Sequence, residues 1–242
     1  MSGEFCMNRL FPLLVLLLAC VLSCACDGLC PRDASSPTAA RERIKNVVIL
    51  IGDGMGPQQL GLLVTYAHHA PHSIYEPMGR ETALERIMES GTLGYARTEA
   101  ADTLVADSGA SSTQMASGEW AGAQMIGLDR NGHAVKTILE IAEEMGKSTG
   151  LVTDTDITHA TPAAFGSHIH DRGLDNEIME HLVYQDIDVV FGGGKRHLVP
   201  VAAGGKRTDG EDLVQVLLDR GYGFVETRNQ MEMFAGSRVW GM

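Results

Sequence analysis

The chain has 242 residues, of which 44% are hydrophobic and 21% are charged. That mixture is typical of a globular protein that can bury a sizeable core. The formal net charge of −12 argues against nucleic acid as a partner, because no basic face is available to neutralise a phosphate backbone. A phosphorylated substrate would also be repelled at long range, so a phosphate site would need concentrated local positive charge, which metal ions supply.

The five cysteines all lie in the amino-terminal part of the chain, and none follows Cys30. The rest of the chain therefore holds no disulfide and no thiolate metal site. Any metal ion there must be bound by Asp, Glu, His or Thr side chains.

The amino terminus has the pattern of a secretory signal peptide over residues 1–26. Arg9 precedes an apolar run, Leu10–Leu22, which ends in small residues and is shorter than the roughly 20 residues that span a membrane. We therefore expect an exported protein, located in the periplasm or outside the cell. The small residues also resemble a bacterial lipoprotein box, so an alternative to simple cleavage is a membrane anchor through lipidated Cys24 or Cys20.

A flexible tether is expected over residues 27–44, which are rich in Pro, Ser and other small residues and lack apolar periodicity. The folded part, 45–242, then begins with the β-branched run Asn46–Ile51, which predicts a strand buried on both faces of a parallel sheet. Further strands are expected over 149–153, 188–191 and 222–225, and helices over 82–90, 111–117, 137–145, 176–184 and 211–220. This alternation predicts an α/β fold, a mainly parallel sheet with helices on both faces.

Asp53 lies between two glycines directly after the first expected strand. Ligands gather at the carboxyl ends of strands in open α/β sheets, and a carboxylate there suits a hard cation. The alternative is that Asp53 only caps the helix that follows.

Ser108 follows Asp107 at the start of an expected helix of small residues, whose free N–H groups would favour an anion. Such a serine can attack phosphorus if its pKa is lowered, and without a histidine beside it in the sequence a metal ion is the expected activator. Asp-Ser before small residues is equally typical of an ordinary helix N-cap.

His159 and Thr161 follow another expected strand and are two residues apart, so in extended chain they would face the same way and could reach one ion. A solvated loop is the alternative. Arg172 has a planar guanidinium that matches two phosphate oxygens, although a lone Arg usually forms a surface ion pair. His168 and His170 lack a matching third ligand nearby, and we interpret them as structural.

Five features occur in one order: Ile51–Gly56, Asp107-Ser108, the run His159–Ala163, Arg172 and Phe191–Gly194. Each is weak alone, but their joint order strongly resembles the alkaline phosphatase family from about Lys45 to Met242. The resemblance implies the three-layer fold of that family, hydrolysis of small phosphate monoesters, two zinc sites and one magnesium site. It also leads us to expect a homodimer for the complete protein.

The resemblance also implies a role for each candidate residue. Ser108 would be the nucleophile, would contact the metal site and would form a phosphoserine. Asp107 would orient Arg172, which would clamp the phosphate oxygens. Asp53 would bridge a zinc ion and the magnesium ion.

Two further residues belong to the implied magnesium site. Thr161 would be a ligand there. Position 159 differs between Asp and His among family members, so His159 would bind a metal directly or hold magnesium through water.

The remaining zinc ligands of the family and a magnesium-binding Glu lie in its carboxyl-terminal half, and no candidate run for them follows Arg172. The only later histidines are His181 and His197. We therefore expect an amino-terminal fragment that is inefficient or inactive alone. Alternatives are a phosphodiesterase or sulfatase-like relative with the same metal core, and a non-catalytic phosphate-binding surface lipoprotein.

Overall fold

The structure is a computed structural model that describes residues 44–70 and 81–242. The chain divides into two compact units, Met1–Ile51 and Gly52–Met242. The predicted signal peptide, Cys20, Cys24 and all but the last residue of the predicted tether lie outside the described residues.

The strand expected over 46–51 is not observed. These residues have no regular secondary structure, and the side chains of Val48 and Leu50 are about four-fifths exposed, at 80% and 83%. A strand is defined by hydrogen bonds to a neighbour, and an apolar β-branched sequence supplies only the preference for extended backbone. The predicted strand was wrong because residue composition does not show whether a neighbouring strand is present to pair with it.

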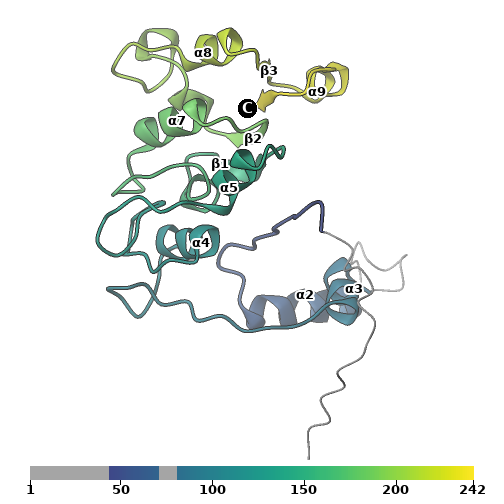
Figure 1. Ribbon diagram of the computed structural model, residues 1–242. Helices are drawn as coiled ribbons and strands as arrows, with labels where there is room; N and C mark the ends of the chain where they lie inside the picture. Colours follow the sequence, from purple (N-terminus) through teal and green to yellow (C-terminus); the bar gives the residue numbers. More distant parts are fainter. Residues whose placement is uncertain (1–43, 71–80) are drawn as a thin grey trace, which may run out of the picture. The chain divides into compact units, whose positions relative to one another are not determined.

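The second unit contains a four-stranded sheet in which every strand is parallel to its neighbours (Figure 1). The spatial order is β1-β2-β4-β3, so the last strand lies between the second and the third. The strands are β1 (Gly150–Asp156), β2 (Val189–Gly193), β3 (Gly223–Val225) and β4 (Val239–Gly241). Three of them were expected, and the parallel α/β fold class is confirmed.

Strand β2 continues through glycines that were expected to end it. A Cβ atom on Gly192 would lie 2.9 Å from Cγ2 of Thr153, and one on Gly193 would lie 2.8 Å from Oδ1 of Asp156. The glycines therefore allow β1 and β2 to approach closely near their carboxyl ends, where a larger residue would force the strands apart.

The expected helices are all present, and local capping explains where they begin. Thr82 and Thr137 each accept an N–H bond at a helix start, while a Glu three residues later bonds back to the cap. This reciprocal capping box satisfies two main-chain donors. The helices are α3 (Ala83–Ser90), α4 (Ser108–Ser117), α5 (Ile138–Glu144), α7 (Asp175–Tyr184) and α8 (Leu213–Asp219).

Several elements were not expected. Helix α2 (Pro57–His69) buries only Ala67, so it lacks the apolar stripe by which a helix is recognised in a sequence. The others are α6 (Ala160–Ala163), α9 (Arg228–Met233) and the 3-10 turns η2 (Lys195–His197) and η3 (Val201–Ala203). None of the helices within 44–70 and 81–242 combines the length and apolarity that crossing a bilayer requires.

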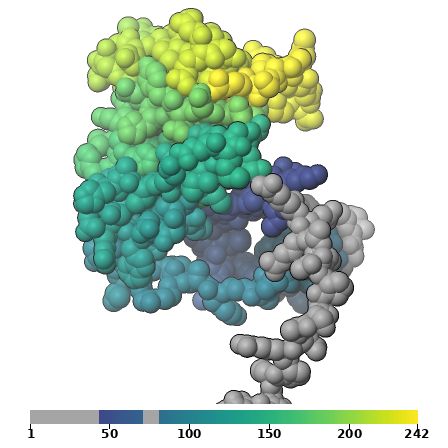
Figure 2. All heavy atoms as spheres, in the orientation of Figure 1, coloured from purple at the N-terminus to yellow at the C-terminus, as the bar shows by residue number. Residues whose placement is uncertain are grey.

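Many buried apolar side chains come from the sheet and from the helices that follow its strands. Helix α7 packs against α8, and α8 packs against β3. In Figure 2 the atoms from α4 to β4 follow one another in teal, green and yellow bands, as expected when each crossover packs beside its own strands. The fully buried side chains include Ile178, Met179, Leu182 and Val183 of α7, Leu213 and Leu217 of α8, Val190 of β2 and Trp240 of β4.

Candidate active site

Asp107 caps helix α4, and Ser108 is the first residue of that helix. The Asp107 carboxylate accepts the N–H of Gly109 at 3.0 Å and the N–H of Ala110 at 3.2 Å, so the helix begins three residues before its expected start at Ser111. These two donors are therefore not free for an anion, contrary to expectation. The two alternatives expected here, a helix N-cap and a nucleophilic serine, are compatible. Asp107 forms the cap with its own carboxylate, and the hydroxyl of Ser108 takes no part in it.

Arg172 joins this helix start from a distant part of the sequence. Its Nη1 atom donates to Oδ2 of Asp107 at 3.0 Å and to Oγ of Ser108 at 2.8 Å. The side chains of Arg172 and Asp107 are only 26% and 17% exposed, so the ion pair is shielded from much of the solvent. The structure thus brings together three residues that were selected from the sequence.

The carboxyl of Asp107 is held in its charged form. Burial alone would raise its pKa, but the N–H of Gln124, the guanidinium of Arg172 and the N–H groups of Ala110 and Gly109 together lower it. With its pKa lowered, Asp107 is negative at neutral pH, and its bond to Nη1 of Arg172 keeps this guanidinium beside Ser108.

Asp53 and Thr161 form a second pair. Oγ1 of Thr161 donates to Oδ2 of Asp53 at 3.0 Å, although the two residues are 108 positions apart. Gly54, with φ of 67°, turns the chain directly after Asp53 into the stretch that leads to α2. A carboxylate and a hydroxyl in contact are oxygen donors of the kind that Mg²⁺ accepts.

His159 and Thr161 do not lie in extended chain, so that expectation was wrong. His159 is the N-cap residue of α6 and Thr161 lies inside this short helix. Pro162 favours this outcome because its fixed φ suits the first turn of a helix. The side chain of His159 is exposed and makes no capping bond. Thr161 contacts Asp53 from a helical position, not from the extended chain that we assumed.

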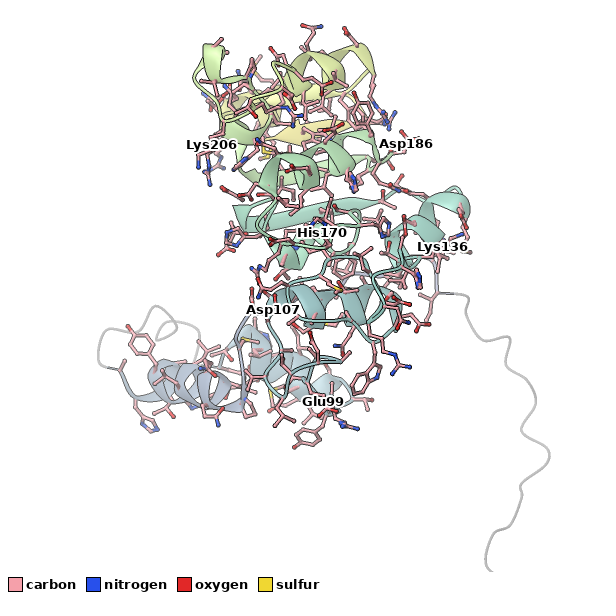
Figure 3. The ribbon with its side chains drawn as sticks, turned by 90° about the vertical axis from the view of Figure 1, so that its left-hand side faces the viewer. Glu99, Asp107, Lys136, His170, Asp186 and Lys206 are labelled. Atoms are coloured by element: carbon pink, nitrogen blue, oxygen red, sulfur yellow. The ribbon has the colours of Figure 1, made fainter. Side chains whose placement is uncertain are left out.

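Helix packing brings the group at the start of α4 close to the pair formed by Asp53 and Thr161, because α4 packs against α6 and α6 packs against β1. The element that begins at Ser108 therefore lies beside the element that carries Thr161. Figure 3 shows Asp107 at the start of α4 and His170 in the stretch that leads to Arg172.

No zinc site is assembled next to Ser108 by the residues that the structure describes. In those ranges one group of acidic side chains has ligand atoms within 4.8 Å of one another, namely Glu180, Asp209 and Glu211. The guanidinium of Arg207, which is fully buried, donates to all three carboxylates. This group is therefore the set of counter-ions of Arg207, and it contains none of the candidate ligands.

Two further residues, Gln124 and His168, make contacts that have no obvious signal in the sequence. The N–H of Gln124 donates to Oδ1 of Asp107 at 3.0 Å. This bond uses a main-chain group, so the pattern of side chains in the sequence does not predict it. His168 contacts the carbonyl oxygen of Gly127 at 2.7 Å and Oε1 of Glu140 at 2.9 Å, contacts of the kind that a structural histidine makes. His170 is exposed.

Comparisons with known proteins identify relatives of the whole folded part. Residues 44–240 match the alkaline phosphatase family. Alkaline phosphatase 3 of Bacillus subtilis (strain 168) is 32% identical over 244 residues, an alignment that covers 96% of this chain and 50% of the relative. The chain thus spans about half the length of that protein.

Solved structures agree with this match. The alkaline phosphatase of Thermus thermophilus superposes with a TM-score of 0.70 and 30% identity, over 78% of this chain and 38% of that one. A variant of the TAB5 alkaline phosphatase, with a His replaced by Glu and Mg bound in its M3 site, gives a TM-score of 0.56 at 28% identity, over 62% of this chain and 42% of that one. The resemblance seen in the sequence motifs is confirmed.

Proposed function

The chain belongs to the alkaline phosphatase family, and on that premise we propose that it hydrolyses phosphate monoesters through a phosphoserine at Ser108. The observation that carries the proposal is the contact of Arg172 Nη1 with both Ser108 Oγ and Asp107 Oδ2. A nucleophile, a cation for the phosphate and an anion that orients this cation meet there at hydrogen-bond distance.

The reaction needs two displacements at phosphorus. Oγ of Ser108 attacks the phosphorus atom, the bond to the ester oxygen breaks, and the alcohol leaves with a proton. Water then attacks the phosphoserine, releasing inorganic phosphate and restoring the serine hydroxyl. Arg172 neutralises charge on the non-bridging oxygens in both steps, since its guanidinium presents several donors in one plane. Asp107 restricts the rotation of Arg172 and thereby lowers the ordering cost of binding phosphate.

Divalent metal ions belong to the proposed site. Asp53 and Thr161 fit a magnesium ion because both offer oxygen atoms in mutual contact, and His159 is the third candidate of this group. When bound, metal ions lower the pKa of the nucleophile and stabilise the leaving oxygen. The described residues do not supply a zinc ligand set next to Ser108, so we expect turnover by this chain to be slow.

Turnover of three substrate classes tests the proposal. With Zn²⁺ and Mg²⁺ supplied, we expect aryl phosphate monoesters to be hydrolysed faster than diesters or sulfate esters. A faster diester or sulfate reaction would instead favour a phosphodiesterase or a sulfatase-like relative. Phosphate binding in calorimetry without any turnover would favour a non-catalytic phosphate-binding protein.

Ser108→Ala should abolish the turnover. The matched control is Ser111→Ala, because the Ser111 hydroxyl only donates to the main-chain oxygen of Asp107. Equal loss in both variants would show that the helix, and not the nucleophile, had been damaged.

We further propose export through the amino-terminal signal pattern. Its support is the apolar run Leu10–Leu22 after Arg9, with small residues beyond it. Fractionation of cells and the mass of the mature amino terminus test this, since cleavage and lipidation at Cys20 or Cys24 give different masses.

A further inference from the structure

Gln124 has a main-chain conformation that is unusual for its residue type. Its φ is 65°, and it is the only residue other than glycine with a positive φ in the ranges 44–70 and 81–242. The left-handed region is natural for Gly and tolerated by Asn or Asp, but a longer side chain such as Gln gains nothing from it. Such a conformation persists only where surrounding contacts hold it in place.

Those contacts link Gln124 to both charged residues of the candidate site. Its N–H donates to Oδ1 of Asp107 at 3.0 Å, and its carbonyl oxygen accepts the N–H of Arg172 at 2.9 Å. Asp107 and Arg172 are joined to each other by their side chains at 3.0 Å. The three residues therefore close a ring of hydrogen bonds, and Ser108 Oγ is attached to it through Arg172 Nη1.

The segment that carries Gln124 is fixed on the side of helix α4. A Cβ atom on Gly109 would lie 3.0 Å from the carbonyl oxygen of Met125, so a larger residue at position 109 would press against the segment. Further along, the N–H of Gly127 donates to Oγ1 of Thr113 at 2.9 Å, and Thr113 is fully buried in α4.

The same segment is fixed on the side of Arg172. Ile126 and Ile169 exchange two main-chain hydrogen bonds, of 2.9 Å and 2.8 Å, in an isolated antiparallel bridge. The carbonyl of Gln124 then meets Arg172 three residues further along the partner stretch. The residues 124–127, which we name the bridging segment, thus connect the nucleophile helix to the stretch of chain that ends at Arg172.

We propose that Gln124 is a positioning residue, whose left-handed main chain sets the distance between Asp107 and Arg172 and so places the Arg172 guanidinium on Ser108. The effect on phosphate rests on the proposed function, whereas the hydrogen-bond ring rests on geometry alone. Gln124 acts through its N–H and C=O groups, so its side chain matters only through its tolerance of a positive φ.

This role makes an unusual demand on substitutions at position 124. Gly and Asn tolerate a positive φ and should preserve the ring, although neither has the Gln side chain. Val is β-branched and resists a positive φ most strongly, so it should open the ring. A contact made by the Gln side chain would give the opposite order, because Gly would then lose the most.

The test compares the whole chain with Gln124→Gly, Gln124→Asn and Gln124→Val. The matched control is Gln215→Val, which makes the same chemical change at an exposed position of α8 with ordinary helical backbone. Amide hydrogen exchange at residues 124 and 172 reports on the ring directly, and calorimetry with inorganic phosphate reports on its consequence.

We expect slow exchange at both amides in the parent chain and in the Gly and Asn variants, and exchange about tenfold faster in Gln124→Val, with phosphate binding weakened by about the same factor. Gln215→Val should change neither. The inference is overturned if Gly and Asn open the ring or weaken phosphate binding as much as Val does, or if Val changes neither quantity in a folded chain. If Val prevents folding, the Gly and Asn variants still decide.

The two proposals fail in different ways. If the parent chain binds no phosphate, the proposed function fails, while the exchange rates still test the ring. Suppose that the parent chain binds phosphate but exchange is not slow in the Gly and Asn variants and fast in the Val variant. The positioning role of Gln124 is then refuted and the proposed function is not.

Discussion

Replacing Asp107 by Asn changes one atom of the side chain and tests the clamp at the start of α4. Each carboxylate oxygen accepts two hydrogen bonds: Oδ1 from Ala110 at 3.2 Å and Gln124 at 3.0 Å, and Oδ2 from Gly109 and Arg172, both at 3.0 Å. An amide has only one acceptor oxygen. In either orientation, the NH₂ group of Asn would face two donors, so two bonds must be lost.

The structure sets the size of the effect. A hydrogen bond to a charged group contributes about 1.5–3 kcal/mol, and all four bonds go to a carboxylate, so losing two gives about 3–6 kcal/mol. Asp107 is mostly buried, at 17% side-chain exposure, so water does not fully replace the lost bonds. For a chain of this length, that loss corresponds to a lowering of the melting temperature by about 10 °C.

Urea unfolding followed by circular dichroism measures the change in the free energy of unfolding. The control is Asp219→Asn, since Asp219 is exposed and accepts one bond from Gln215, and it should change stability by about 0.5 kcal/mol or less. If Asp107→Asn is as stable as this control, the carboxylate does not clamp the helix start and the account of Arg172 orientation is refuted.

Three further substitutions test other parts of the structure. Arg207→Met should lower the free energy of unfolding by about 1–3 kcal/mol, because it removes a fully buried guanidinium that bonds three half-exposed carboxylates, and an unchanged urea midpoint would contradict this. Burial alone would raise the pKa of Glu140, but its bonds to the helix cap and to His168 lower it, so its stabilisation is present above about pH 4.5 and is lost as the pH falls through the lower folded-state pKa. Glu140→Gln should therefore be less stable than the parent at neutral pH and converge with it in acid, and a difference that is independent of pH would refute stabilisation by the charged Glu140 carboxylate. Thr161→Val should weaken Mg²⁺ binding about tenfold in calorimetry through the lost bond to Asp53, and unchanged affinity would remove Thr161 from the proposed site.

Features that depend on neighbouring residues were predictable from the sequence. The cap residues Thr82 and Thr137 precede an apolar pattern with a Glu three positions later, and both helices begin there. The strands β1 and β2 were found because β-branched residues end at glycines or polar residues. Such signals are local, and tertiary packing did not override them.

Features that depend on distant partners were not predictable in the same way. The run Asn46–Ile51 prefers extended backbone, but its sequence does not show which strand, if any, pairs with it. The contact between Arg172 and Asp107 spans 65 positions and was expected only from the resemblance to a family. Gln124 left no signal at all, because its N–H and C=O groups are common to nearly every residue.

Trapping the covalent intermediate shows whether Ser108 is the nucleophile. The chain is incubated with radiolabelled inorganic phosphate in the presence of Zn²⁺ and Mg²⁺, quenched in acid and digested, and the labelled peptide is sequenced. The account predicts acid-stable phosphate on Ser108 and none in Ser108→Ala. Label on another residue, undiminished label in Ser108→Ala, or no label on the parent chain would contradict it.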